Sequence, residues 1–145
     1  MGEGRIDSRV VIRAPIARVF ERLIDHEGMA KWPGICSCKL VKEGTPRNGL
    51  GAVRRIRAGG LTLDEEVVHY EPPRAFDYAI IRGLPIDRHR GTIRLAEVEG
   101  GVEIDWRIRI SSAWPFVAEI IAIALRRGLP KALRYLTKEL EREGP

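Results

Sequence analysis

The 145-residue sequence lacks the features that mark membrane-spanning and exported proteins. No apolar run reaches the roughly 18 residues of a membrane span; the nearest, residues 113–125, is shorter and contains Glu119. No apolar stretch follows the N-terminal residues, so we expect no secretory leader and a cytoplasmic protein. The composition, 44% hydrophobic and 31% charged, is that of an ordinary globular chain, and the length predicts one domain over residues 1–145.

Cysteine is also scarce. Cys36 and Cys38 are one residue apart, so a disulfide between them would be strained, and on a strand they would share a face. With His26, His69 and His89 they form no ligand spacing for a metal. We therefore expect reduced structural thiols and no metal.

The glycine-rich segment 49–51 precedes a predicted strand rather than a helix N-terminus. It therefore lacks the aligned amides of a phosphate loop, and we expect no cofactor.

Glutamine is absent and Asn48 is the single asparagine. Depletion of thermolabile amides beside abundant charged residues fits a thermophilic source, although GC-rich codon usage would also raise the arginine content. The net charge of +5 comes from 25 basic and 20 acidic residues, with no block of five like charges. We expect a mixed solvated surface and no nucleic-acid partner.

Hydrophobic periodicity predicts the elements. Alternation and turn residues predict strands over residues 5–13, 35–42, 52–57, 61–70, 74–82, 86–97 and 102–110. Helical spacing predicts short helices after Pro15 and near residues 29–32, and a long helix from Pro115 to the C-terminus with a bend at Pro130. Strands without intervening helices form antiparallel sheets. The fold class is therefore α+β: a seven-stranded antiparallel sheet curved around the long C-terminal helix.

The order of local motifs resembles a known superfamily over residues 6–141. The motifs are Ile12-Arg13-Ala14-Pro15 with Val19-Phe20, Asp25 with Trp32-Pro33, Gly49-Leu50-Gly51-Ala52 with Arg54, Val67 and Tyr70-Glu71-Pro72-Pro73 with Tyr78, and Gly101 with Ile104 and Trp106. In this order they resemble the polyketide cyclase/dehydrase branch of the START / polyketide cyclase (SRPBCC) superfamily, which has the helix-grip fold. The usual threonine after the glycine of the last motif is Val102 here. The resemblance implies a hydrophobic cavity between the long helix and the sheet.

The predicted cavity wall follows from three kinds of evidence. A two-residue turn at Glu99-Gly100 places Ile93 opposite Trp106 and Arg94 opposite Asp105, with the arginines on the outer face. The inner face then carries Phe76, Tyr78, His89 and Trp106, and the helical stripe adds Ile120 and Ala124. Trp32 and Val53 come mainly from the resemblance, and Arg54 is the alternative to Val53. Glu65 is expected on the inner face near the mouth of the cavity.

These residues support three hypotheses. The first is a carrier or sensor of a small hydrophobic ligand such as a lipid, quinone or polyketide-like molecule. The second is a polyketide cyclase or aromatase, for which Tyr78 and His89 are the candidate catalytic groups, together with Glu119 if that residue faces the pocket; we expect Glu119 outside. No serine or cysteine is visibly paired with His89, so nucleophilic catalysis has no support. The third is a protein-interaction or membrane-surface module that uses the apolar helix. The oligomeric state does not follow from the sequence.

Overall fold

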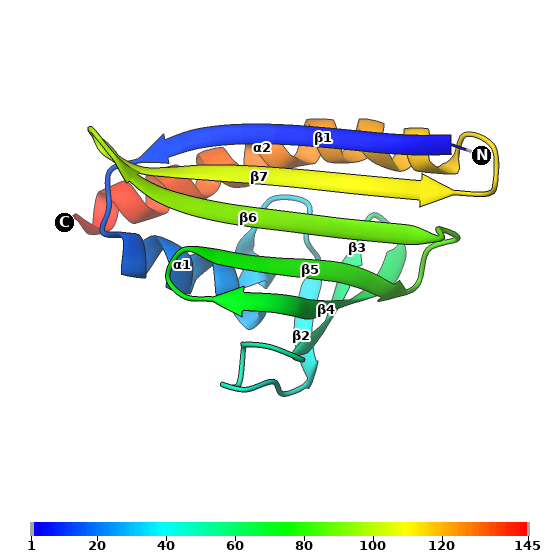
Figure 1. Ribbon diagram of the computed structural model, residues 1–145, viewed down its shortest axis with the longest axis horizontal. Helices are drawn as coiled ribbons and strands as arrows, with labels where there is room; N and C mark the ends of the chain where they lie inside the picture. The colour runs from blue at the N-terminus through cyan, green and yellow to red at the C-terminus, as the bar shows by residue number, and fades with distance from the viewer. Residues whose placement is uncertain (1, 145) are drawn as a thin grey trace.

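Seven strands and two helices, joined by short turns, make up the part of the chain that the computed structural model describes, residues 2–144 (Figure 1). The strands are β1 (Gly2–Ile12), β2 (Ser37–Lys42), β3 (Val53–Ala58), β4 (Leu61–Glu71), β5 (Ala75–Arg82), β6 (Arg88–Val98) and β7 (Gly101–Ser112). The helices are α1 (Ile16–Ile24) and α2 (Val117–Glu143). The predicted second short helix is a 3-10 turn, η1 (Glu27–Lys31). The helix-grip architecture is confirmed.

The sheet is antiparallel in the order β1-β7-β6-β5-β4-β3-β2. Strands β2 to β7 therefore form a meander, and β1 returns beside β7 (Figure 1). The predicted register of the last hairpin is confirmed: Ile93 lies opposite Trp106 and Arg94 opposite Asp105. Gly100 sits in this turn with φ of 92°, a conformation that glycine adopts without steric cost.

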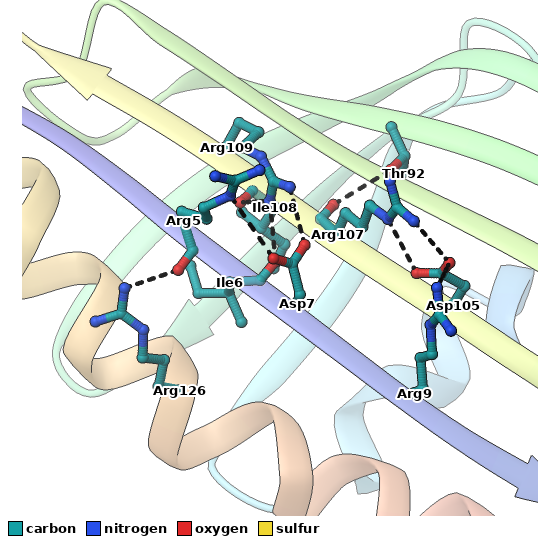
Figure 2. A network of polar contacts seen from close by, with 10 residues as sticks. All are labelled: Arg5, Ile6, Asp7, Arg9, Thr92, Asp105, Arg107, Ile108, Arg109 and Arg126. Atoms are coloured by element: carbon teal, nitrogen blue, oxygen red, sulfur yellow. Dashed lines mark hydrogen bonds and ion pairs between the residues drawn. The ribbon is translucent and has the colours of Figure 1, made fainter.

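The outer face of the sheet carries ion pairs, and Arg94 does not pair with the residue directly opposite it. Arg94 bonds Asp77 on β5 rather than Asp105, and Asp105 instead pairs with Arg107 and Arg9 (Figure 2). Asp77 is the more buried carboxylate and needs more compensation, which Arg90 and Arg94 both supply. Burial raises the pKa of Asp77, but these two arginines outweigh it and hold the pKa below its ordinary value.

Helix α2 packs along β1 through small residues. A Cβ atom on Gly4 would lie 2.7 Å from the Ala118 carbonyl oxygen and 2.9 Å from the Ala122 Cβ, so the glycine permits this close approach. The buried stripe of α2 is therefore Ala118, Ala122, Leu129, Ala132, Leu133, Leu136 and Leu140. The prediction that Ile120 and Ala124 face the sheet is wrong: Ile120 is 64% exposed, and Ala124 is exposed as well.

The sequence predicted a bend at Pro130, and α2 continues through this residue without interruption. The bend itself stays a prediction. The Arg126 guanidinium donates to the Arg5 carbonyl oxygen and ties the middle of α2 to β1 (Figure 2). Among residues 2–144, no helix combines the length and apolarity that a bilayer crossing requires.

Candidate functional site

Aromatic side chains from three strands and η1 meet on the inner face of the sheet. Tyr78 lies between its neighbours, with ring centroids 5.5 Å from His89, 6.3 Å from Trp106 and 6.4 Å from Phe76. Trp32, at the end of η1, contacts Trp106 edge-on at 6.2 Å. All five residues are buried, and strand alternation places Phe76, Tyr78, His89 and Trp106 on the inner face, as predicted.

The hydroxyl of Tyr78 accepts a hydrogen bond and retains its own proton. The Trp106 Nε1–H donates to the hydroxyl oxygen at 2.9 Å. Burial, followed by the negative charge of Glu65, raises the pKa of Tyr78 above its ordinary value, so the group is protonated at neutral pH. No acceptor among residues 2–144 takes that proton. Tyr78 is therefore a fixed donor within an aromatic wall.

His89 is a second fixed donor. The Ile80 backbone N–H donates to its Nδ1 at 3.1 Å, so the proton of the neutral ring must be on Nε2. Burial lowers the pKa of His89 and outweighs the opposing charge of Glu65, and the charge of Arg54 adds to the lowering, so the ring is neutral at pH 7. The pairing between β5 and β6 ends at Tyr78 and Gly91, although both strands continue. Just beyond that point the His89 imidazole accepts the hydrogen bond of the Ile80 N–H.

A buried charged cluster adjoins the wall. The Arg54 Nε and Nη2 donate to the same Glu65 oxygen at 2.8 and 2.6 Å, and Nη1 lies 3.2 Å from the His26 Nδ1. His26 is fully buried, and its Nε2 lies 2.9 Å from the Asn48 carbonyl oxygen. The Arg54 guanidinium also lies over the Tyr78 ring, 4.9 Å from the centroid.

The protonation states within this cluster follow from its contacts. Nδ1 of His26 faces a guanidinium that can only donate, so it accepts, and Nε2 donates to Asn48. Burial and the charge of Arg54 lower the pKa of His26 to about 3. Burial is the largest single effect on the pKa of Arg54 and lowers it, but the charge and hydrogen bonds of Glu65, together with smaller contributions from Tyr78 and Cys38, leave the pKa raised. The result is a neutral His26 that orients an ionised Arg54–Glu65 pair.

Sequence reasoning missed this cluster as a unit. It kept Arg54 only as an alternative to Val53, and in the structure Arg54 takes the inward position between Ala52 and Ile56. Val53 is also buried, but it lies outside the main core cluster. A signal was available: a two-residue turn at Gly59-Gly60 aligns Arg54 with Glu65, which is the observed register. Nothing local to His26 indicated its burial.

Two of the residues predicted to line one cavity, Trp32 and His89, line separate cavities of the described chain. A groove of about 910 Å³ at one end of the sheet is lined by Gly4, Ile80, His89 and Ile110, together with outer-face arginines. Trp32 lines a separate cavity of about 370 Å³ beside the end of α2. Ile120 and Ala124 are removed from the predicted set by their exposure, and an apolar pocket bounded by the remaining residues stays a prediction.

Glu119 is half-buried rather than outside as expected, because its carboxylate lies against Gly2 on β1. Its Oε1 is buried without a partner among residues 2–144. Gly2 is opposite Ser112 at the start of β1, away from the register positions of Tyr78 and Trp106. We therefore assign Glu119 no role in the aromatic wall.

Both cysteines are free, with Cys36 exposed and Cys38 buried. Burial raises the pKa of the Cys38 thiol to about 11, so this thiol is protonated and unreactive at neutral pH. Within residues 2–144, no three His, Cys, Asp or Glu side chains cluster closely enough to hold a metal ion.

Solved structures share this fold. The Zhui aromatase/cyclase from Streptomyces sp. R1128 is 17% identical, with a TM-score of 0.83 over 99% of this chain and 97% of that one. A START superfamily protein from Mycobacterium smegmatis is 12% identical, with a TM-score of 0.79 over 97% and 99% of the two chains. The major latex-like protein 151 from Panax ginseng is 15% identical, with a TM-score of 0.76 over 95% and 97%.

A search of curated protein sequences found no significant match. The profile described as polyketide cyclase / dehydrase and lipid transport matches residues 3–141, which include the aromatic wall, the buried pair and almost all of β1 and α2. The chain therefore belongs to the polyketide cyclase / dehydrase and lipid transport family.

Proposed function

We propose that the protein is a carrier or sensor that binds a small hydrophobic ligand with a carbonyl oxygen on the inner face of its sheet. The observation that carries this proposal is the pair of fixed donors, Tyr78 and His89, in an otherwise aromatic and aliphatic wall. Ligand sites are mostly apolar with a few placed polar groups. Family membership supports the same class of ligand.

The chemistry of the two donors selects the polar group of the ligand. The Tyr78 hydroxyl oxygen already accepts a hydrogen bond from Trp106, and Nδ1 of His89 already accepts one from the Ile80 N–H. What each offers is one proton; their rings are 5.5 Å apart, and His89 also lines the groove of about 910 Å³. The complement is an acceptor such as a ketone, quinone or ester oxygen. A saturated hydrocarbon would leave both donors without partners, which is costly in a buried site.

A cyclase or aromatase is the second candidate. Arg54, Tyr78 and His89 together could stabilise the negative charge that develops on an enolate oxygen. Proton abstraction also requires a base within hydrogen-bond reach. The carboxylate of Glu65 is held by Arg54, and Nδ1 of His89 is occupied by a backbone N–H. The absence of a free base in this cluster of described residues places the carrier ahead of the enzyme.

The test compares two ligands of nearly equal shape, 9-fluorenone and fluorene, which differ in one carbonyl group. The wild-type protein should bind fluorenone more tightly than fluorene. Tyr78→Phe should reduce that preference about tenfold by removing one donor while keeping the ring. Tyr70→Phe is the matched control, because Tyr70 is on β4 of the same sheet, packs against Phe20 of α1, and has no part in the donor pair.

Two outcomes contradict the proposal: failure to bind either compound, or an equal affinity for both that Tyr78→Phe leaves unchanged. Native mass spectrometry of the purified protein provides an independent readout, since a co-purified ligand should contain a carbonyl oxygen. Turnover of a polyketide-like substrate, with a loss of rate in Arg54→Met, would favour the cyclase instead.

A further inference from the structure

The outward face of α2 combines exposed apolar and unpaired basic side chains. Trp114, Phe116, Ile120 and Ile123 are 67%, 70%, 64% and 48% exposed, and they lie within ten residues of one another at the start of the helix. Isolated exposed apolar residues are ordinary, but four large ones in one place are typical of an interaction site. We call this cluster the apolar end of α2.

The same face continues as a basic stripe. Arg127, Lys131, Arg134 and Lys138 follow Ile120 and Ile123 at spacings of three and four residues, which keeps them on one side of the helix. All four are exposed, and none has an ion-pair partner among residues 2–144. Arg126, by contrast, is turned to β1 and bonds the Arg5 carbonyl oxygen (Figure 2).

The acidic side chains of this half of the helix are engaged elsewhere. Glu139 pairs with Arg142, Glu143 pairs with Arg22, and Glu141 accepts the backbone N–H of Arg13. The outward face from Ile120 to Lys138, roughly 27 Å long at 1.5 Å per residue, is therefore apolar at one end and cationic along the rest.

The backbone at the start of α2 holds one of the apolar rings outward. Phe116 has a φ of 67°, and it is the one non-glycine residue with a positive φ in the described part of the chain. A bulky residue in this region is strained, and strain of this kind concentrates at functional positions. Since the ring is 70% exposed, packing against the rest of the protein does not explain the strain.

We infer that this face of α2 docks the protein onto an anionic phospholipid bilayer, with the apolar end in the interfacial region and the basic stripe on the headgroups. Aromatic and aliphatic side chains with flanking Lys and Arg are the composition of helices that lie at a membrane surface. The four cations are complementary to anionic lipids. They would repel one another across an interface between two copies of this chain, which argues against a second copy as the occupant.

The docking surface adjoins the groove at the same end of the sheet. The Ser112 hydroxyl accepts the Trp114 N–H and donates to the Pro85 carbonyl oxygen, so the start of α2 is bonded to the loop before β6. That loop leads to Asp87 and His89, which line the groove. Docking here would bring the groove to the membrane. If the proposed function holds, on which this step rests, the protein would take up its hydrophobic ligand from the bilayer through this groove.

The experiment measures co-sedimentation with vesicles of 70% phosphatidylcholine and 30% phosphatidylglycerol, and with vesicles of phosphatidylcholine alone. The wild-type protein should bind the anionic vesicles at least tenfold more tightly, and added salt should weaken that binding. Ile120→Glu and Lys131→Glu should each reduce the affinity by roughly tenfold. Val41→Glu and Lys39→Glu on β2 make the same chemical changes at exposed positions away from α2, and they should leave binding within twofold.

Phe116→Gly separates binding from folding. Glycine adopts the positive φ without strain, so this variant should be at least as stable as the wild type and still bind vesicles more weakly. The inference is overturned if the wild type does not bind anionic vesicles, or if the β2 variants lose as much affinity as the α2 variants. It is also overturned if sedimentation shows a dimer that Ile120→Glu dissociates, because a second copy would then cover this face.

The two proposals can fail separately. Fluorenone binding in the absence of vesicles tests the inner wall alone, and Ile120→Glu should not change it. Retained fluorenone binding without vesicle binding would refute the docking surface and leave the ligand proposal standing. The reverse result would refute the ligand proposal alone.

Discussion

Replacing Glu65 with leucine should destabilise the protein by about 3–5 kcal/mol, because it leaves the Arg54 guanidinium buried without its counter-charge. Both side chains are nearly inaccessible, at 4% exposed for Arg54 and 10% for Glu65. Two of the three hydrogen bonds that Arg54 makes in the cluster end on one oxygen of Glu65. The guanidinium cannot lose its proton to escape the penalty.

The other single variants should cost less, for reasons that the contacts supply. Glu65→Gln keeps an oxygen acceptor for Arg54 and loses only the charge, so it should fall at the low end, about 3 kcal/mol. Arg54→Met leaves a carboxyl group that can take up a proton at moderate cost, so its effect should be smaller still. The double variant Arg54→Met/Glu65→Leu removes both charges and should lie within about 1 kcal/mol of the wild type.

Urea denaturation of the four variants and the wild type provides the measurement, with the free energy of unfolding extrapolated to water at a common m-value. The coupling energy from the double-mutant cycle is the quantity that decides the reasoning. If Glu65→Leu costs less than about 1 kcal/mol, or if the double variant loses the sum of the two single losses, water rather than Glu65 compensates Arg54. The inner face would then be hydrated, and the donor pair would already be bonded to water.

Two further predictions concern a protonation state and a packing contact. Folding lowers the pKa of His26 from 6.5 to about 3, so between these values the unfolded chain binds one more proton than the folded chain. The free energy of unfolding should therefore fall as pH drops from 6.5 toward 3, by at most about 1.4 kcal/mol per pH unit. Urea curves at pH 7, 6 and 5 should show this pH dependence, which His26→Gln should reduce and His69→Gln should leave unchanged. Gly91→Ala places a Cβ 2.2 Å from the Tyr78 ring and should destabilise the protein and abolish fluorenone binding, whereas Gly128→Ala, in open space on α2, should stabilise it by about 0.5–1 kcal/mol; the same sign for both would contradict the packing argument.

Local patterning was enough to determine the sheet and its inner aromatic wall. Alternation along each strand assigns Phe76, Tyr78, His89 and Trp106 to one face, and the two-residue turn at Glu99-Gly100 sets the register of the last hairpin. The same arithmetic at Gly59-Gly60 would have paired Arg54 with Glu65. These features depend on neighbours along the chain, so the sequence contains the information that they require.

Tertiary structure decided the features that depend on contacts distant in sequence. The α2 sequence offers two stripes at helical spacing, one through Ile120 and Ala124 and one through Ala118 and Ala122, and periodicity alone cannot rank them. Gly4 on β1 decides between them. Because Gly4 has no side chain, Ala118 and Ala122 can pack closely against the strand, and Ile120 then faces outward.

The polar contacts of the site have the same origin. His26 is neutral because it is fully buried and because the charge of Arg54, 28 residues away, lies against its Nδ1. Arg94 chooses the less exposed Asp77 over Asp105, its direct neighbour in the register. Periodicity predicts which face of its own helix or strand a side chain occupies. It does not predict how far other elements, packed against that face, will bury a charged group. For this reason the sequence determined the fold and the wall, and the assembled structure determined the charged cluster and the exposed face of α2.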